Sequence, residues 1–550
     1  MSAPARAPVV CGAIGSFDPE RMRRLAGLLG DAPRTVHEDD SSILMLDREP
    51  IEWNGRRQRG LGWIEGEIWR ARPDVVDWRG AARCGATGLV LEGRRRFLHS
   101  AVNGLAPLYW IEDRGTTYFS SRIDPLVRSS PDLLSIDWDA WAAIIALRYP
   151  LGDRTPFAEV RRLPPFSTLR RRLGAARPRA HTSPWEQIEP GAGLAGAADA
   201  AVEGLREALS PIGRSVICPL SGGRDSRMLF SALAAEGRVE RAVTVSDDEG
   251  ETIEEDLAAA VAAAFGVTHE RLSGSPASYP QDWHERAMRV EYQFVDHAWL
   301  VPVARRVEGL RTPVPDGFAI DVFVQSERHF NPPGALEHRR REGASLTLFE
   351  ALRRYGLAHR ALADDLHDPV VSRAREQFLA ATRRFRGHPS QNLLSTYATR
   401  SVRGVATYPT GLLGREARVL TPGASDAVVS AALSATQLEK DGGALYRAIF
   451  ERLDPMAGRL PSTTDTPRSG PRLERRWRSQ PALDAHRRLL AEGPLAEHLS
   501  PQLRAWLAAP DGVELSGDLR LGMEAVSLLH AWWRRYRDCL REVDASELSG

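Results

Sequence analysis

The stretch of residues 215–237 constrains the fold more than any other part of the sequence. An apolar run at 215–220 leads into Ser-Gly-Gly-Arg-Asp-Ser at 221–226, and an amphipathic run follows until Gly237. This order predicts a strand, a tight turn and a helix. The glycines let backbone N–H groups approach an anion, and the helix adds its positive N-terminal end. The stretch therefore predicts a nucleotide phosphate site, although the spacing alone also fits an ordinary serine-capped connection.

The side chains of this loop supply the groups that a phosphate site needs. Ser221 and Ser226 carry hydroxyl groups that donate hydrogen bonds, and Asp225 carries hard oxygen ligands that suit Mg²⁺. Gly222 and Gly223 leave room for an anion next to their backbone N–H groups. No Gly-Lys-Ser/Thr follows, so this is not the Walker pattern.

The segments after the loop continue an alternation of strands and helices. Residues 242–245 predict a second strand, 253–265 a helix and 267–272 a third strand-like segment. This alternation favours a parallel α/β sheet, in which ligands bind at the carboxyl ends of the strands. Val245 ends the second strand and is therefore counted among the nucleotide-binding residues. Asp247, in the acidic run that follows, is either a ribose contact or a solvated loop residue.

A second turn of the same kind lies further along the chain. An apolar run ends at Asp316-Gly317, and Asp321 follows four residues after the glycine. Asp321 is either a second oxygen ligand for Mg²⁺ bound to phosphates or an acidic residue favoured by a helix dipole.

The first third of the chain has a different character, because short apolar or alternating runs between turn residues predict strands there. These runs are 43–46, 61–64, 88–91 and 96–99, with a hairpin formed by 107–111 and 116–120. Helical patterns are limited to 19–29 and 138–147. A Pro- and Arg-rich passage with one last hairpin follows, and the remainder from 344 to 548 is mainly helical. We therefore predict two domains, 1–190 and 191–550.

Composition excludes several classes of function. The net charge is +1, so no strong field recruits nucleic acid or a membrane surface. The four cysteines are scattered, which indicates neither a zinc site nor a disulfide framework. No run approaches the roughly 20 apolar residues that span a bilayer, and no signal peptide is evident at the N-terminus. We expect a soluble, cytoplasmic protein.

Ser-Gly-Gly-x-Asp-Ser after an apolar strand resembles the pyrophosphate loop of the ATP pyrophosphatases of the asparagine synthetase superfamily. Spaced features agree with this resemblance along most of the chain. Asp316-Gly317-x-x-x-Asp321 looks like a degraded Gly-x-Gly-x-Asp-Glu turn, and Glu416-Ala417-Arg418-Val419 resembles the Glu-x-Arg-x-Pro segment of the family. Residues 108–110 with 118–121 resemble the end of its glutaminase-like domain, and 155–165 its interdomain connector.

The resemblance implies a fold and a set of functional residues. The fold is α/β: an N-terminal Ntn-hydrolase-like, glutaminase-like αββα sandwich, then a parallel-sheet ATP pyrophosphatase domain with a large helical C-terminal part. The implied cofactors are ATP and Mg²⁺, with pyrophosphate on the 221–226 loop and the metal on Asp225 and Asp321. Glu416 is implied as the group that orients or deprotonates an attacking amine, with Tyr397 as its partner. Tyr397 fits a core ring with a satisfied hydroxyl equally well.

Cys11 is the departure that distinguishes members of this superfamily. A working glutaminase of this kind needs cysteine as its first residue, because the free α-amine is the base for the thiol. Cys11-Gly12-Ala13-Ile14-Gly15 looks like that start, but ten residues precede it. We therefore interpret Cys11 as a buried remnant rather than a nucleophile.

Members with a silent glutaminase domain activate a carboxylate with ATP and let an amine of the same molecule attack. The 445–450 run and the long C-terminal helical part look more like lasso peptide macrolactam synthetases than β-lactam synthetases. The resemblance thus implies an AMP-forming ligase that closes an isopeptide ring in a ribosomal precursor peptide. The alternative is an asparagine synthetase, fed by glutamine or ammonia, or a β-lactam synthetase-like amide-forming enzyme. Lys440, the only lysine, lies too close to Glu416 to carry over the family's catalytic cation, which stays unassigned.

The same resemblance implies particular partners. The substrate is a core peptide, and a leader peptidase and a leader-binding protein are expected beside it. No nucleic acid and no membrane span are expected. Ring closure also requires that the peptide be held pre-folded, an entropic task that suits a large helical cavity.

Overall fold

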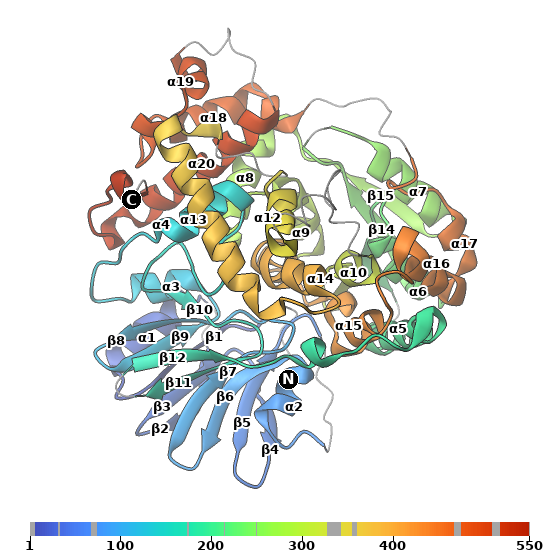
Figure 1. Cartoon of the computed structure of the whole chain (residues 1–550), viewed down its shortest axis with the longest axis horizontal. Coiled ribbons are helices and arrows are strands. Elements are labelled where there is room, and N and C mark those ends of the chain that lie inside the picture. Colours follow the sequence, from blue (N-terminus) through green and yellow to red (C-terminus); the bar gives the residue numbers. More distant parts are fainter. Residues whose placement is uncertain are drawn as a thin grey trace.

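The structure is a computed structural model that describes residues 6–30, 33–67, 74–172, 175–213, 215–248, 250–326, 343–354, 360–466, 475–508 and 517–548. It is mixed α/β, with several sheets, one of them parallel, and a large helical C-terminal region. In Figure 1 the N-terminal strands, in blue and cyan, form one body, and the parallel sheet and the C-terminal helices form the rest.

Two six-stranded antiparallel sheets make up the N-terminal body. The first has the order β10-β8-β9-β1-β3-β2 and the second β12-β11-β7-β6-β5-β4. The strands of the first sheet are β1 (Val10–Ile14), β2 (Arg34–Asp39), β3 (Ser42–Leu46), β8 (Tyr109–Asp113), β9 (Thr116–Ser120) and β10 (Arg161–Arg162). Those of the second are β4 (Ile51–Asn54), β5 (Arg59–Ile64), β6 (Ala86–Glu92), β7 (Arg95–His99), β11 (Ser167–Arg172) and β12 (Ala175–Ala180).

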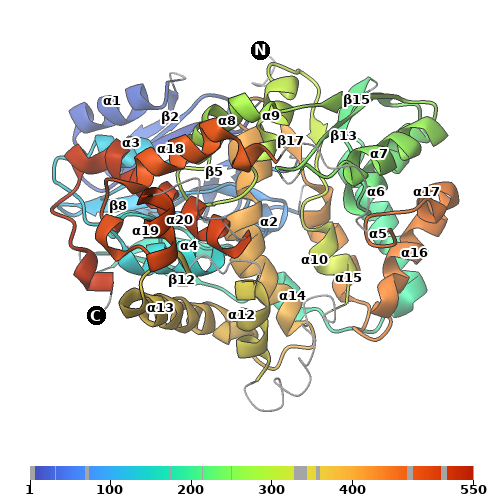
Figure 2. The same ribbon diagram turned by 90° about the horizontal axis from the view of Figure 1, so that it is seen from above.

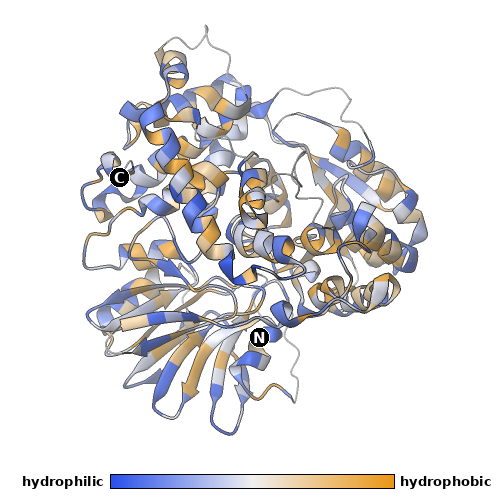
Figure 3. Cartoon of the chain, in the orientation of Figure 1, coloured by the Kyte–Doolittle hydropathy of each residue, from blue (hydrophilic) through white to orange (hydrophobic). Residues whose placement is uncertain are grey.

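The two sheets pack face to face, because alternate residues of their strands share one apolar cluster. Val10, Leu44 and Phe119 of the first sheet contact Trp63 and Leu98 of the second within it. Hydrophobic residues lie along the strand centres and hydrophilic residues at the outer turns (Figure 3). Burial of one face of each sheet therefore fixes the register of the strands.

Helices cover the outer faces of this sandwich. The helices α1 (Pro19–Leu28) and α3 (Ile123–Arg128) pack on the first sheet, and α2 (Trp78–Arg83) packs on the second. Asp18 caps α1 and Asp77 caps α2, each accepting a backbone N–H of the first turn. The order of layers is thus helix, sheet, sheet, helix.

The parallel sheet begins after α5 (Gly193–Leu209). Its strands β13 (Val216–Pro219), β14 (Val239–Val245) and β15 (Thr268–Leu272) lie in that order, and β16 (Val314–Pro315) lies beside β13 on the other side. A second parallel pair joins β16 to β17 (Val419–Leu420). The connecting helices are α6 (Asp225–Ala234), α7 (Ile253–Ala264), α8 (Tyr279–Arg289), α9 (Val301–Val307) and α10 (Ile320–Val324).

The C-terminal region is helical and falls into two groups. The helices α18, α19 and α20 lie at one end of the molecule, away from α5, α6, α16 and α17 around the parallel sheet (Figures 1 and 2). The helices of the region are α12 (Ala344–Arg354), α13 (Asp364–Thr382), α14 (Gln391–Thr396), α15 (Asp426–Leu433), α16 (Ala444–Leu453), α17 (Pro455–Arg459), α18 (Gln480–Leu490), α19 (Pro501–Ala508) and α20 (Gly517–Tyr536). The helix α4 (Trp138–Leu147) packs against α13 and α20, which joins them to the N-terminal body.

Backbone hydrogen bonds connect the N-terminal body to distant parts of the chain. The N–H of Ala7 donates to the carbonyl of Gly414 at 2.7 Å. The connection after α3 is also bonded to a distant segment. The N–H of Leu134 donates to the carbonyl of Cys539 at 2.9 Å, and its carbonyl accepts from the N–H of Arg541 at 2.8 Å.

The strand and helix predictions are confirmed for the elements that local patterns define. The predicted strands at 43–46, 61–64, 88–91 and 96–99 correspond to β3, β5, β6 and β7. The last long helix, α20, ends at Tyr536, where a short 3₁₀ turn at residues 537–539 follows. Among the helices of the described residues, none has the length and apolar character to cross a bilayer.

Candidate active site

The 221–226 loop lies at the carboxyl end of β13 and leads directly into α6. Its own hydroxyl groups hold it in shape, because the N–H of Ser221 donates to Ser226 Oγ at 3.0 Å and the two Oγ atoms lie 3.0 Å apart. The N–H of Gly223 donates to Ser221 Oγ at 3.2 Å. Within the described residues, no side chain caps the N-terminus of α6. The first-turn N–H groups of this helix are therefore the free positive end that an anion would meet.

The neighbours of β13 define the edge of the sheet at which the loop lies. The strand has β14 on one side and β16 on the other, so the chain order reverses at β13. Open α/β sheets bind their ligands at such a point, outside the carboxyl ends of the strands. The 221–226 loop and the turn after β16 both lie at this edge.

The two predicted acidic turns meet in the structure. Gly317, directly after Asp316, lies so close to α6 that a Cβ atom built on it would be 3.0 Å from the backbone carbon of Asp225 and the nitrogen of Ser226. Only glycine permits this approach without displacing the loop. The same turn leads into α10, where Asp321 lies in the first turn.

Three carboxyl groups and one hydroxyl gather at this junction, and of the carboxyl groups Asp316 is buried while Asp225 and Asp321 are half-buried. Burial and the neighbouring Asp321 carboxylate raise the pKa of Asp225 well above its usual range. Burial also raises the pKa of Asp316 to about 6, although its Oδ1 accepts the N–H of Phe318 at 2.9 Å. The hydroxyl of Tyr446, from α16, donates to Asp225 Oδ1. Like charges in a dry site favour an added cation.

Both the backbone N–H and the backbone carbonyl of Gly222 form hydrogen bonds. Its N–H donates to Glu254 Oε2 at 2.7 Å, and Glu254 is in the first turn of α7. Its carbonyl accepts from the N–H of Thr463 at 3.1 Å and from Arg227 Nη2 at 3.3 Å. The backbone of the loop is therefore fixed by α6, by α7 and by the segment after α17.

The segment after α17 lies along the loop. Arg224 Nη2 lies 2.7 Å from Asp465 Oδ1, and Arg224 Nε lies 3.3 Å from Ser462 Oγ. The buried Arg227 donates to the carbonyls of Leu460 and Pro461, each at 2.6 Å. Desolvation lowers the pKa of Arg227 to about 10. Both arginines thus brace the protein and leave the catalytic cation unassigned.

Val245 ends β14 at the same edge of the sheet. Its side chain is buried in a cluster with Ile217 and Val243, so its main chain is the part able to meet a nucleotide. In the loop that follows, Asp248 is buried and pairs with Arg476 at 3.0 Å. Burial raises the pKa of Asp248 to about 7 despite this partner.

The other two predicted catalytic residues lie away from this junction. Glu416 precedes β17 and is therefore at the amino end of the parallel pair, where its carbonyl accepts from Gly309 and its carboxylate lies 3.0 Å from Arg289 Nη2. Tyr397 is 3 % exposed, and its hydroxyl donates to the carbonyl of Asn103 at 2.8 Å in the N-terminal body. The structure does not bring either side chain to Asp225, and the Tyr397 geometry is that of a core ring with a satisfied hydroxyl.

Cys11 lies in the first sheet, and its side chain belongs to the apolar cluster that includes Met22 and Leu25 of α1. It is fully buried in β1, where it is opposite Met45 on one side and Ser120 on the other. Its nitrogen is a peptide nitrogen within the strand, and burial raises the pKa of its thiol to about 12. A reactive cysteine needs to form the thiolate and to be partly exposed to solvent, and Cys11 meets neither requirement. Lys440 is equally buried, and its Nζ donates to the carbonyls of Phe323 and Ala432, each at 3.2 Å.

Tyr446 and Glu254 are the site residues that the sequence did not single out. Each contacts the loop from another helix. The hydrogen bond from Tyr446 to Asp225 spans 221 residues. A helical stretch with a tyrosine is ordinary in sequence, so only the tertiary structure shows its role.

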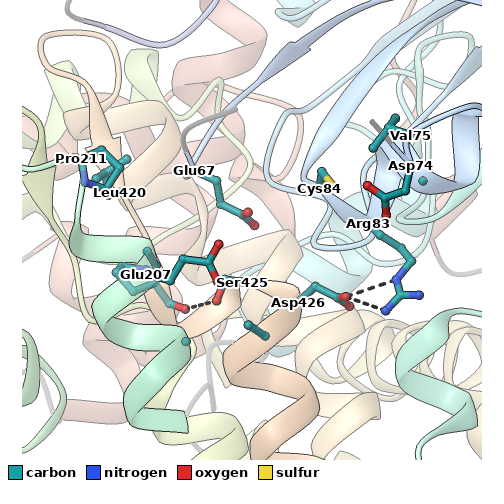
Figure 4. Close-up of a pocket in the computed structure, with 16 residues that line it drawn as sticks. Glu67, Asp74, Val75, Arg83, Cys84, Glu207, Pro211, Leu420, Ser425 and Asp426 are labelled. Carbon is teal, nitrogen blue, oxygen red and sulfur yellow. Dashed lines mark hydrogen bonds and ion pairs between the residues drawn. The ribbon is translucent and has the colours of Figure 1, made fainter. Parts of the chain in front are cut away.

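A cavity of about 310 Å³ lies elsewhere, between the N-terminal body and α5 with α15 (Figure 4). Glu67, Asp74, Glu207 and Asp426 give it an acidic lining, and Arg83 closes one wall by an ion pair of 3.0 Å with Asp426. It shares no residue with the 221–226 loop and is not part of the candidate active site.

Among the residues that the structure describes, no group of three or more His, Cys, Asp or Glu side chains is placed to hold a metal ion. A metal at Asp225 and Asp321 would thus depend on ligands from a bound phosphate. No protein-family model matches the sequence, and no curated protein matches it.

Proposed function

We propose that the protein is an ATP-dependent, AMP-forming ligase that closes a macrolactam ring in a peptide, as a lasso peptide cyclase of the asparagine synthetase-like superfamily does. The observation that carries the proposal is the contact between the two acidic turns. Gly317 packs on Asp225 and Ser226 at the point where the strand order reverses. This places the anion-binding end of α6 beside a pair of carboxylates, as the splitting of a nucleoside triphosphate requires.

The residues at this junction fit a divalent cation. Asp225 lies next to Asp321, and its pKa is raised first by burial and then by the charge of Asp321. Mg²⁺ takes one or two protein carboxylates together with phosphate oxygens, which matches a site with two aspartates. When bound, the metal would neutralise charge on the phosphates as pyrophosphate leaves.

The chain's own groups would act in sequence. The first-turn N–H groups of α6 and the hydroxyls of Ser221 and Ser226 would hold the β- and γ-phosphates. The side-chain carboxylate of an Asp or Glu in the peptide would attack the α-phosphorus, and the bond to pyrophosphate would break. The peptide's N-terminal amine would then attack the acyl carbon, lose a proton and expel AMP.

The buried Cys11 supports an amine from the substrate itself rather than from glutamine. Its thiol is buried and its nitrogen is a peptide nitrogen. Cys11 therefore has neither the accessible thiol nor the free α-amine that a glutaminase nucleophile needs. The helix, sheet, sheet, helix order supports an Ntn-hydrolase-like origin for residues 1–190 that has become a structural partner. An ammonia-fed asparagine synthetase or a β-lactam synthetase-like enzyme is the competing proposal.

One assay separates these functions. The protein is incubated with ATP, Mg²⁺ and a candidate core peptide, and pyrophosphate release and peptide mass are followed together. Loss of one water from the peptide, with one pyrophosphate per ring, is the expected result. Asparagine formed from aspartate and ammonia would instead establish the synthetase. ATP bound but never split would exclude a ligase of either kind.

A further inference from the structure

Two adjoining cavities lie between the N-terminal body and the parallel-sheet part, away from the 221–226 loop. The larger one borders the acidic cavity, with which it shares Gly66 and Glu67. The larger has a volume of about 170 Å³ and the smaller about 60 Å³. They share four lining residues, Ala7, Pro8, Glu65 and Thr410. Both parts of the chain therefore contribute walls, and Glu65 lies at the boundary between the two spaces.

The smaller cavity is lined by arginines whose charge is poorly matched. Arg122 and Arg415 are half-buried, and neither guanidinium makes a hydrogen bond or an ion pair with any part of the chain that the structure describes. Burial and repulsion by Arg122 lower the pKa of Arg415 to about 10, although the Glu291 carboxylate opposes this shift. The third arginine, Arg289, is already matched by Glu285 at 2.7 Å and Glu416 at 3.0 Å.

One carboxylate, that of Glu291, acts on both arginines, so their two positive charges are only partly matched. Glu291 lines the same cavity, but its Oε1 accepts the N–H groups of Ile123 and Asp124 at 2.7 and 3.1 Å, which caps α3. Glu65 Oε1 is buried without a hydrogen-bond partner, and burial raises the pKa of Glu65 to about 8. At neutral pH this side chain is thus largely a neutral acid that can donate a hydrogen bond.

The larger cavity also contains an arginine without a hydrogen-bond or ion-pair partner among the described residues. Arg418 lines it, and within the described residues its guanidinium also lacks a hydrogen bond or ion pair. The neighbouring Arg48 is matched by Asp47 at 2.8 Å. The acidic residues of this wall are engaged, because Glu67 accepts from Asn103 at 2.8 Å and Glu49 pairs with Arg34.

Buried charges without partners are costly, so proteins retain them where a ligand supplies the partner. The planar guanidinium matches carboxylate and phosphate oxygens in pairs. A space of about 60 Å³ is several times the volume that one water needs, which suits a single oxyanion group. The larger space has room for a short chain beyond it.

We infer that this interdomain cavity binds a small organic anion, with one carboxylate or phosphate group on Arg122 and Arg415 and the rest of the molecule extending past Glu65 toward Arg418. The site does not depend on the proposed ATP chemistry, because it shares no residue with the 221–226 loop. A ligand there would join the two parts of the chain and stabilise their interface.

The test measures binding to the full-length protein without ATP. Calorimetry and thermal unfolding are run with glutarate and with inorganic phosphate, against glutaramide and against chloride at equal ionic strength. We expect saturable binding of glutarate or phosphate, with a rise of a few degrees in melting temperature, and no effect of glutaramide. Phosphate binding alone would indicate a phosphoryl ligand, and glutarate binding alone a carboxylate.

The variants Arg122→Gln and Arg415→Gln locate the site. Each should weaken binding about 10-fold or more, because one charge-assisted pair is lost. The exposed Arg95→Gln is the matched control and should bind like the unaltered protein. Absence of saturable binding of either anion, or binding by Arg122→Gln and Arg415→Gln that is as tight as that of the unaltered protein, would overturn the inference.

A second measurement covers variants that fail to fold. Phenylglyoxal modifies accessible arginines, and peptide mass spectrometry identifies them in the unaltered protein. We expect the bound anion to protect Arg122 and Arg415 but not Arg95. Equal modification with and without the anion would contradict the site.

Discussion

The side-chain carboxylate of Glu254 accepts a hydrogen bond of 2.7 Å from the backbone N–H of Gly222. An anionic group of the protein therefore lies on the loop that we assign to pyrophosphate. The contact has two opposed consequences, since it fixes the loop and also repels a phosphate that approaches it.

Glu254→Gln separates these consequences, because glutamine keeps the acceptor oxygen and removes the charge. We expect pyrophosphate to bind about 5-fold more tightly, which corresponds to about 1 kcal/mol of relieved repulsion. Pyrophosphate inhibition of the ATP-dependent reaction measures this change. Asp256→Asn, on the same helix but paired with Arg271, is the control. Weaker pyrophosphate binding by Glu254→Gln would mean that the charge of Glu254 matters more for fixing the loop than for repelling a phosphate.

Tyr446→Phe tests the hydroxyl that donates to Asp225. Loss of a hydrogen bond to a charged group costs about 1.5 to 3 kcal/mol, so the Mg²⁺ concentration for half-maximal activity should rise about 10-fold. Tyr536→Phe is a matched control, because Tyr536 also donates to an aspartate, Asp124, at 2.8 Å. A similar effect of both variants would indicate a general loss of stability.

Asp225→Asn and Asp321→Asn should each reduce pyrophosphate release about 100-fold or more, since a metal ligand and its charge are lost. The melting temperature of Asp225→Asn should not fall, because the change removes one of two like charges in a buried site. The exposed Asp132→Asn serves as the control. Unchanged turnover in Asp225→Asn would refute the metal assignment.

Cys11→Ala should leave ATP-dependent turnover unchanged, because the thiol is fully buried and away from the 221–226 loop. In the native protein, iodoacetamide should modify Cys84 and Cys539, which are partly exposed, well before Cys11 and Cys218. Mass spectrometry of peptides reports each site. A glutamine-driven reaction that Cys11→Ala abolishes would reverse our interpretation of the sandwich.

His99 should make stability depend on pH. It is buried in β7 against Trp53 and Trp78, and burial lowers its pKa to about 3. The unfolded state binds a proton near pH 6.5, so the stabilisation from His99 is present above that pH and is lost as pH falls toward 3. Urea unfolding of His99→Leu should therefore show a pH slope smaller by up to about 1.4 kcal/mol per unit between pH 6.5 and 3. If the free energy of unfolding depended on pH in the same way for His99→Leu and for the unaltered protein, this prediction would be wrong.

The elements of the fold were predictable wherever a local pattern decides them. The hairpin of β8 and β9 follows from two alternating runs around Gly115, and α6 follows from an amphipathic run after two glycines. Asp225 and Asp321 belong to such local patterns, and the sheet brings their two turns together.

Positions that depend on packing between distant segments were not predictable. Glu416 was assigned from the resemblance of a short segment, but the direction of β17 places it at the amino end of the sheet, opposite Asp225. Tyr397 faces the N-terminal body, where its hydroxyl donates to the carbonyl of Asn103, a residue 294 positions earlier in the chain. Tyr446 contacts Asp225 only because α16 packs on α6.

The backbone pairs of Leu134 with Cys539 and Arg541 also bear on how the protein is made. A ribosome adds about 5 to 20 residues per second, so roughly 20 to 80 s pass between synthesis of Leu134 and of Cys539. During that time the connection after α3 has neither of these backbone partners. The N-terminal sandwich can therefore begin to fold early, but its junction with the rest of the molecule is completed only after residues 539–541 have been synthesised. A chain that stops short of Cys539 should remain a client of chaperones and proteases.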